Sequence, residues 1–344
     1  MLFFRNDYGN GAHPAILDAL CKTNPELTAG YGVDPYCQKA AQRIRHLCRN
    51  ESADVHFLVG GTQVNKTAIG AFLRPWEAVI TADTGHIEVH EAGAIEHNGH
   101  RLFPLPNADG KLRPEQIRQL CALYQQEETS AEPKLVYISN TTELGTVYTK
   151  EELRALRAVC DQLGLYLYCD GARLAAAMAV SDADLADYAA TCHAFTIGGT
   201  KNGLLFGEAL VITEPALMPS FRRCMKQQGA MLAKGRLLGV QFLAALEDDL
   251  YMTLARQAAD TAKRLAEGLK ALQIPMLIDS PSNQLFPILP NEIVGKLRES
   301  VAFEFWSAVD DRSSAIRFVT AWHTTTEEVD ALLALLQQLK HLHC

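Results

Sequence analysis

Short apolar runs alternate with longer amphipathic stretches over the first 213 residues of the chain. Each apolar run has the length of a buried strand, and the amphipathic stretches repeat their apolar residues at helical spacing. Strands that alternate with helices are typical of an α/β domain with a largely parallel sheet. The expected strands are residues 55–59, 78–82, 135–139, 165–170, 194–197 and 209–213. The expected helices are residues 15–22, 36–49, 66–73, 114–126, 150–163 and 182–190.

The pattern changes after residue 213. Residues 231–272 form a long amphipathic stretch, which predicts helices that lead into a smaller C-terminal unit. That unit combines apolar runs with a terminal amphipathic stretch, so we expect a small α+β domain. Its expected strands are residues 275–278, 284–289 and 315–319, and its expected helix is residues 327–339. The predicted division is an N-terminal arm (1–14), a large domain (15–245) and a small domain (246–344).

Composition narrows the class of protein. With 344 residues, of which 48% are hydrophobic and 21% charged, the chain is long enough for two domains with large buried cores. A net charge of −8 disfavours nucleic acid or an anionic membrane as the main partner. No apolar run has the length of a membrane span, and polar residues at 5–7 interrupt any secretory signal. The nine scattered cysteines form no CxxC pair, which favours reduced thiols in the cytoplasm.

Candidate chemistry begins with Asp170 and Lys201. Asp170 ends the expected strand 165–170, and Lys201 follows a Gly-Gly-Thr turn 31 positions later. This pair suits pyridoxal 5′-phosphate (PLP), because a lysine amine forms a Schiff base with its aldehyde and a carboxylate keeps its pyridine nitrogen protonated. Taken singly, such an aspartate is more often a cap residue and such a lysine a surface charge. The prediction therefore depends on further motifs.

Two more turns follow expected strands. Gly60, Gly61 and Thr62 precede the helix 66–73, so backbone N–H groups and the Thr62 hydroxyl can bind a phosphate. His86 follows the strand 78–82 and can stack on a cofactor ring. Because ligands bind at the carboxyl ends of parallel strands, we expect all of these residues to converge on one site.

These motifs resemble those of the threonine aldolase / β-eliminating lyase family. The resemblance runs from about residue 3 to about residue 320, in the family's order and at about its spacing. It implies the fold type I architecture of aspartate aminotransferase and other PLP-dependent transferases, with a mostly parallel seven-stranded sheet. The matching sequences are Gly11-Ala12-His13-Pro14, Gly30-Tyr31-Gly32-Val33-Asp34, Gly60-Gly61-Thr62-Gln63, Thr84-Gly85-His86-Ile87, Asp170-Gly171-Ala172-Arg173 and Gly199-Thr200-Lys201.

An amino-acid substrate needs a cation for its carboxylate, and two arginines are candidates. Arg173 comes three residues after Asp170, so on a helix the two side chains would share a face. Arg317 lies in the alternating strand 315–319. Arginine suits this role because its planar fork bonds a carboxylate twice. The resemblance supports both arginines, and it implies a further contact from Asn6, where relatives carry a serine.

The resemblance also implies the remaining roles. It implies a homodimer or homotetramer in which Tyr31 reaches the neighbouring subunit's site, and it implies either a monovalent cation or no metal. The catalytic residues are Lys201 and His86; the cofactor contacts are Gly61, Thr62, His86, Asp170, Arg173 and Lys201; and the substrate contacts are Asn6, Tyr31, Arg173 and Arg317.

A metal hydrolase is a rival interpretation of the region around His86. His86 and His90 have the i,i+4 spacing of a helix face, but Ala94 stands where the HExxH zinc pattern needs a second histidine. We therefore expect no zinc site, while a monovalent cation stays open.

The favoured function is cleavage of β-hydroxy-α-amino acids, such as L-threonine, to glycine and an aldehyde. This reaction needs a base for the β-hydroxyl proton, and among the motifs His86 is the nearest candidate, directly or through a water, although ring stacking is its main expected role. β-Elimination or transamination on the same scaffold is the alternative. A protein that only binds is disfavoured by the presence of Asp170, Lys201, Arg173, His86 and the Gly-Gly-Thr turn. The sequence leaves open the aldehyde and the threo/erythro preference.

Overall fold

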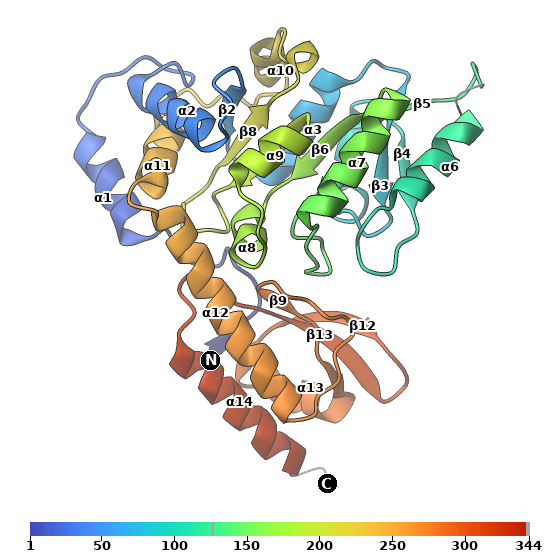
Figure 1. Cartoon of the computed structure of the whole chain (residues 1–344). Coiled ribbons are helices and arrows are strands. Elements are labelled where there is room, and N and C mark those ends of the chain that lie inside the picture. The colour runs from blue at the N-terminus through green and yellow to red at the C-terminus, as the bar shows by residue number, and fades with distance from the viewer. Residues whose placement is uncertain (125–126, 342–344) are drawn as a thin grey trace.

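A computed structural model describes residues 1–124 and 127–341, which form a large sheet domain and a smaller C-terminal domain (Figure 1). The large domain contains a seven-stranded sheet in the order β2-β8-β7-β6-β5-β3-β4. All neighbouring strands are parallel except β8, which is antiparallel to both β2 and β7. The mostly parallel seven-stranded sheet was predicted. The strands are β2 (Asp54–Leu58), β3 (Glu77–Ala82), β4 (Leu102–Leu105), β5 (Glu132–Ser139), β6 (Tyr166–Asp170), β7 (Ala194–Gly198) and β8 (Glu208–Ile212).

Helices cover both faces of this sheet, because alternate residues of each strand are apolar on opposite faces. In β5, Val136 and Ile138 belong to one buried cluster, whereas Leu135 and Tyr137 belong to the other. The first cluster is covered by α1 (Pro14–Thr23), α2 (Pro35–Leu47), α6 (Pro114–Tyr124), α7 (Lys150–Leu163), α8 (Leu174–Ala179), α9 (Leu185–Thr191) and α11 (Arg236–Leu246). The second is covered by α3 (Gly61–Phe72), α4 (His86–Val89), α5 (Ala94–His97) and α10 (Phe221–Gln227).

Most of the expected helices lie close to their observed bounds, although α3 begins at Gly61 and not at residue 66. Helix α7 begins and ends at the predicted residues, because Thr149 and Glu152 form a complete capping box and Gly164 ends the helix in a left-handed conformation. The predicted helix 114–126 ends at Tyr124, and residues 125 and 126 lie outside the described part of the chain. A short 3-10 turn, Pro215–Leu217, follows β8.

The small domain packs helices on a short antiparallel sheet. Its strands are β9 (Gln284–Leu285), β10 (Ile288–Pro290), β12 (Glu304–Ala308) and β13 (Ser313–Val319), with β13 pairing to the other three. Its helices are α12 (Leu250–Ala271), α13 (Asn291–Leu297) and α14 (Thr326–His341). The N-terminal strand β1 (Leu2–Phe3) joins this domain by pairing with β11 (Val301–Ala302), and the N-terminus lies beside it in Figure 1.

Two strand predictions in this domain were wrong. Residues 275–278 form only an isolated bridge between Met276 and Pro287, since no neighbouring strand continues the ladder. The predicted strand 284–289 is interrupted between β9 and β10, where Pro287 has no N–H to donate. Elsewhere in the chain as well as here, strands β1, β4, β11 and β12 were not predicted. In β12 the residues are half-buried or exposed, so the strand lacks a clear apolar pattern.

Helix α12 connects the two domains, as Figure 1 shows. Its N-terminal residues Tyr251 and Ala255 are buried in the large-domain cluster, whereas Leu265 and Leu269 are buried in the small-domain cluster. The predicted boundary between residues 245 and 246 precedes this helix, and the two cores divide within it. No helix in the described ranges has the length and apolar character needed to cross a bilayer.

The close packing of α11 on α2 gives a stability prediction. A Cβ at Gly239 would lie 2.4 Å from the backbone nitrogen of Cys37, so Gly239→Ala forces two helices apart. We expect a loss of about 1–3 kcal/mol in the free energy of unfolding.

Gly295 of α13 is the matched control, because a Cβ there would meet no atom within 4 Å. Alanine exceeds glycine in helix propensity by about 1 kcal/mol, so Gly295→Ala should be neutral or stabilising. Urea unfolding monitored by circular dichroism measures the free energy of unfolding of both variants. Equal stability of the two variants would contradict the packing described here.

Candidate active site

A cavity of about 290 Å³ lies at the carboxyl edge of the large sheet. Strands β2, β5, β6 and β7 end beside it, and antiparallel β8 begins there, so side chains from distant segments meet at this edge. The structure thus brings together the predicted residues Gly61, Thr62, His86, Asp170, Arg173 and Lys201. The cavity is lined by Tyr8, Val59, Gly60, Gly61, Thr62, His86, Ser139, Thr141, Glu143, Asp170, Ala172, Arg173, Thr200, Lys201 and Glu208.

The N-terminus of α3 faces this cavity without a side-chain cap. The helix begins at Gly61, earlier than the predicted residue 66, and Gly60 at its N-cap provides no capping side chain. A Cβ at Gly60 or Gly61 would meet no atom within 4 Å, so the space above the first turn is open. The first N–H groups of a twelve-residue helix are therefore available to an anion such as a phosphate.

Asp170 is held as a buried carboxylate. Its Oδ2 accepts hydrogen bonds from Asn65 Nδ2 and Tyr137 Oη, both at 2.7 Å, and its Oδ1 accepts one from Ala172 N–H at 2.9 Å. Burial alone would raise its pKa, but the charge of His86 and these hydrogen bonds lower the pKa below the ordinary value. A permanently charged acceptor is what the protonated nitrogen of a pyridine ring requires.

Lys201 presents a free amine to the same cavity. Within the described ranges its Nζ has no hydrogen bond or ion pair, and its nearest aromatic contact is the Tyr8 ring, with the centroid at 6.0 Å. Burial, reinforced by the charge of Arg173, lowers the pKa of the amine. Both effects favour the neutral, nucleophilic form.

Glu208 is a second buried acid near this lysine. Thr200 Oγ1 donates to its Oε1 at 3.1 Å, while Oε2 is buried without a partner. Burial raises the pKa of Glu208 to about 8, so the group holds its proton at neutral pH.

Arg173 is positioned by a residue that sequence analysis missed. Its Nε and Nη2 donate to the two carboxylate oxygens of Asp7 at 2.7 and 3.0 Å, and Asn283 Nδ2 donates to Asp7 at 3.1 Å. The prediction that Asp170 and Arg173 share a helix face was wrong, because α8 begins only at Leu174 and Arg173 is its N-cap. The positive charges of Arg173 and Lys201 overcome burial and lower the pKa of Asp7.

Asn6 and Arg317 are not among the residues that line the cavity. Asn6 Oδ1 accepts from Tyr8 N–H at 3.1 Å, and its predicted contact with a substrate stays a prediction. The Nη1 of Arg317 reaches Gln284 Oε1 at 3.4 Å, and its Nε is buried without a partner. Burial, with the nearby charge of Arg173, lowers its pKa. An unsatisfied guanidinium of this kind is suited to bind a carboxylate.

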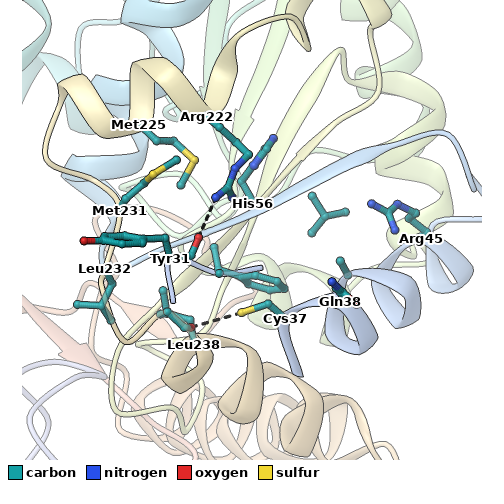
Figure 2. Close-up of a pocket in the computed structure, with 15 residues that line it drawn as sticks. Tyr31, Cys37, Gln38, Arg45, His56, Arg222, Met225, Met231, Leu232 and Leu238 are labelled. Atoms are coloured by element: carbon teal, nitrogen blue, oxygen red, sulfur yellow. Dashed lines mark hydrogen bonds between the residues drawn. The ribbon is translucent and has the colours of Figure 1, made fainter. Parts of the chain in front are cut away.

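Tyr31 lies in a different pocket, shown in Figure 2, which Lys201 does not line. Its carbonyl accepts from Arg222 at 2.9 Å, and its N–H donates to Ala233 at 3.0 Å. The residue is 46% exposed, and Lys226 Nζ lies 4.6 Å from the centroid of its ring. The side chain therefore points to the surface rather than to the cavity of its own chain.

Further polar residues surround His86, and none of them was included among the predicted site residues. Glu91 Oε1 lies 2.9 Å from His86 Nδ1 and accepts from Asn65 Nδ2 at 2.8 Å. Burial lowers the pKa of His86, but the Glu91 hydrogen bond and the charge of Asp170 outweigh it and raise the pKa overall. His90 follows α4 as its C-cap, with its ring 5.5 Å from that of His86.

Glu143 lies on the other side of His86. Its Oε1 accepts from the backbone N–H of His86 at 2.9 Å and from Ser139 Oγ at 2.6 Å. The sequence did carry a signal for Glu143, because a polar run follows the expected strand 135–139. Ligands bind at the carboxyl ends of parallel strands, a principle that identified Asp170 and applies equally to Glu143.

The chain is similar to known proteins along nearly its whole length. A family model described as β-eliminating lyase matches residues 4–288. The low specificity L-threonine aldolase of Pseudomonas aeruginosa is 32% identical over 335 residues, covering 96% of this chain and 95% of that protein. A solved threonine aldolase from Leishmania major is 45% identical, with a TM-score of 0.97 over 98% of this chain and 99% of that one. Aspartate aminotransferase from Thermus thermophilus shares the fold at 16% identity, with a TM-score of 0.72 over 98% and 91% of the two chains.

The buried pair of Asp7 and Arg173 gives a prediction for stability. Removing one partner of a buried ion pair leaves a desolvated charge, so Asp7→Asn should cost about 3–5 kcal/mol at pH 7. The folded pKa of Asp7 is depressed, so its stabilisation is complete above the unfolded value of about 4 and is lost as pH falls through the folded pKa. The difference in the free energy of unfolding between wild type and Asp7→Asn should therefore become smaller below about pH 4.

Asp330→Asn is the matched control, since the ion pair of Asp330 with Arg264 is about half exposed. It should change the unfolding midpoint little at either pH. Urea unfolding at pH 7 and at acidic pH measures these differences. If the difference in the free energy of unfolding between wild type and Asp7→Asn does not change with pH, the charged pair is not the cause of that difference.

Proposed function

The chain belongs to the β-eliminating lyase family, and on that premise we propose that it is a PLP-dependent carbon–carbon lyase of the threonine aldolase type. It cleaves L-threonine, L-allo-threonine or a related β-hydroxy-α-amino acid to glycine and an aldehyde. The names of the similar proteins from P. aeruginosa and L. major support this substrate class. The observation that carries the proposal is one cavity that contains a free lysine amine, a buried carboxylate and an uncapped helix N-terminus.

The residues of the cavity fit PLP. The open first turn of α3, at Gly61 and Thr62, would hold the phosphate. Asp170 would face the ring nitrogen, His86 would lie against the ring, and Lys201 would bind the aldehyde carbon. When bound, PLP supplies an electron sink that is conjugated to Cα of the substrate.

Substrate orientation is the task of the two arginines. Arg173 has its charge balanced by Asp7, whereas the buried Nε of Arg317 has no hydrogen-bond partner among the residues that the structure describes. We assign the substrate carboxylate chiefly to Arg317, with Arg173 kept in place by Asp7. Holding the carboxylate in one place would orient Cα, so these residues would decide which bond of Cα is aligned with the electron sink that PLP would supply. Selection of Cα–Cβ over Cα–H is thus a matter of orientation.

The experiment that tests the proposal is a product assay. The purified chain with PLP is incubated with L-threonine, L-allo-threonine, phenylserine and L-serine. Glycine with the matching aldehyde is the expected product. Pyruvate or 2-oxobutanoate with ammonia, and no glycine, would indicate β-elimination and contradict the aldolase assignment.

Lys201 is expected to hold the cofactor covalently. The wild-type chain should therefore show the visible absorption of lysine-bound PLP, and Lys201→Ala should lose that band together with activity, by several orders of magnitude. Lys263→Ala, a change at an exposed lysine of α12, is the control and should keep both. An unchanged band in Lys201→Ala would place the covalent link elsewhere.

We further propose that two subunits share each site, in a homodimer or homotetramer. Tyr31 is exposed, and its backbone is held by hydrogen bonds with Arg222 and Ala233, which supports a role outside its own chain's cavity. Tyr31→Ala should lose turnover but keep the visible band of the cofactor. Mixing it with inactive Lys201→Ala chains should restore activity, because a hybrid dimer contains one site with both residues intact.

Subunit exchange in that mixture must be verified by mass spectrometry of labelled chains. Each variant alone, at the same total concentration, is the control. Verified hybrids without recovered activity would place Tyr31 outside any shared site.

A further inference from the structure

The carboxyl group of Glu143 lines the cavity and is assigned neither to the cofactor nor to the substrate carboxylate. It follows β5 in a turn, and Ser139 Oγ and the His86 N–H both donate to its Oε1. These bonds leave Oε2 without a hydrogen bond from another residue in the described ranges. The side chain is half-buried and lines the cavity, so this oxygen can meet a ligand.

Retro-aldol cleavage needs such an oxygen, because the β-hydroxyl must lose its proton as the aldehyde forms. Three carboxyl groups line the cavity: Glu143, Asp170 and Glu208. Asp170 uses both oxygens in hydrogen bonds and is assigned to the ring nitrogen. Glu208 has a pKa of about 8 and keeps its second oxygen fully buried, so it is a poor acceptor. Glu143 is the carboxyl group with an oxygen still available.

His86 is the competing base, and the structure argues against it. Its raised pKa, caused by Glu91 and Asp170 against the effect of burial, favours the protonated ring, which cannot accept another proton. Its ring is also assigned to the cofactor face. The positive charge of His86 in turn helps Glu143 to stay ionised.

We propose that Glu143 is the catalytic base that removes the β-hydroxyl proton, an inference that rests on the proposed aldolase function. The proton moves from the substrate oxygen to Oε2 of Glu143. The O–H electron pair becomes the second bond of the aldehyde carbonyl, and the Cα–Cβ pair moves to Cα, where the bound cofactor delocalises it. A proton then returns to Cα to give glycine, so atoms and charges balance.

The test uses Glu143→Gln, since glutamine keeps the Oε1 acceptor for Ser139 and His86 and replaces Oε2 by an amide that cannot take a proton. Cleavage of β-hydroxy amino acids should fall about 10²–10⁴-fold. Three properties need no β-hydroxyl base and should stay near wild type. They are the dissociation constant of glycine, read from the cofactor spectrum; exchange of the glycine α-proton in D₂O; and elimination of chloride from β-chloroalanine.

Two further variants complete the design. Glu88→Gln changes an exposed acid on the same short helix as His86 and should leave every measurement unchanged. His86→Asn removes the ring that covers the cofactor and should slow all reactions, including exchange and elimination. A selective loss of cleavage in His86→Asn, with cleavage intact in Glu143→Gln, would reassign the base to His86.

A pH profile gives an independent measurement. Burial and the charge of Asp170 raise the pKa of Glu143. Hydrogen bonds from Ser139 and from the backbone N–H of Glu143 itself, together with the charge of His86, oppose this rise in pKa. Arg173, Tyr137 and Tyr148 also face the group. Wild-type cleavage should therefore fall as pH drops through a value above that of an ordinary glutamate, and this limb should be absent in Glu143→Gln. Infrared difference spectra of wild type minus Glu143→Gln, without cofactor, should show the same carboxyl titration.

The outcomes separate the two claims. If the wild type forms no aldehyde from any β-hydroxy amino acid, both the proposed function and this assignment fail. If the wild type forms an aldehyde, but Glu143→Gln cleaves at a similar rate or keeps the acidic limb of the pH profile, only the assignment to Glu143 is overturned. A selective loss of cleavage with intact glycine binding and exchange supports it.

Discussion

The rest of the site depends on one buried anion, the carboxylate of Asp170. Burying a lone carboxylate is unfavourable, and here hydrogen bonds from Asn65, Tyr137 and the Ala172 N–H compensate. Asn65 also bonds Glu91, which in turn orients the ring of His86. The groups assigned to the nitrogen and to the face of the cofactor ring are therefore parts of one hydrogen-bonded network, fixed before any ligand binds.

A second carboxylate connects the domains. Asp7 belongs to the N-terminal arm, which pairs with the small domain through β1 and β11. It accepts from Arg173 of the large domain and from Asn283 of the small domain. The position of the Arg173 guanidinium, which we propose helps Arg317 to orient the substrate, thus depends on three separate segments of the chain. Domain arrangement and substrate orientation are coupled at this point.

The strand pattern predicted six of the seven strands of the large sheet, and it predicted the site residues that follow its parallel strands. Asp170, Lys201 and Thr62 could be predicted as site residues because each comes just after an apolar run. Glu208 could not be predicted in this way, because it begins an antiparallel strand, and that strand starts at the edge where the parallel strands end. Asp7 was missed because its partner lies 166 residues away, a contact that no local pattern encodes. The short strands of the small domain were not predicted correctly for a related reason. Half-exposed segments such as β12 depend on neighbouring strands for their structure, and their own sequence shows no clear pattern.

The most direct test of this account is the protonation state of the ring nitrogen in the loaded chain. PLP labelled with ¹⁵N at the pyridine nitrogen would be bound to wild type and to Asp170→Asn, and its chemical shift followed from neutral to alkaline pH. An ionised Asp170 beside that nitrogen predicts a protonated ring throughout in the wild type and a deprotonated ring in the variant. A deprotonated nitrogen in the wild type, or a protonated one in Asp170→Asn, would contradict the central role given to this carboxylate.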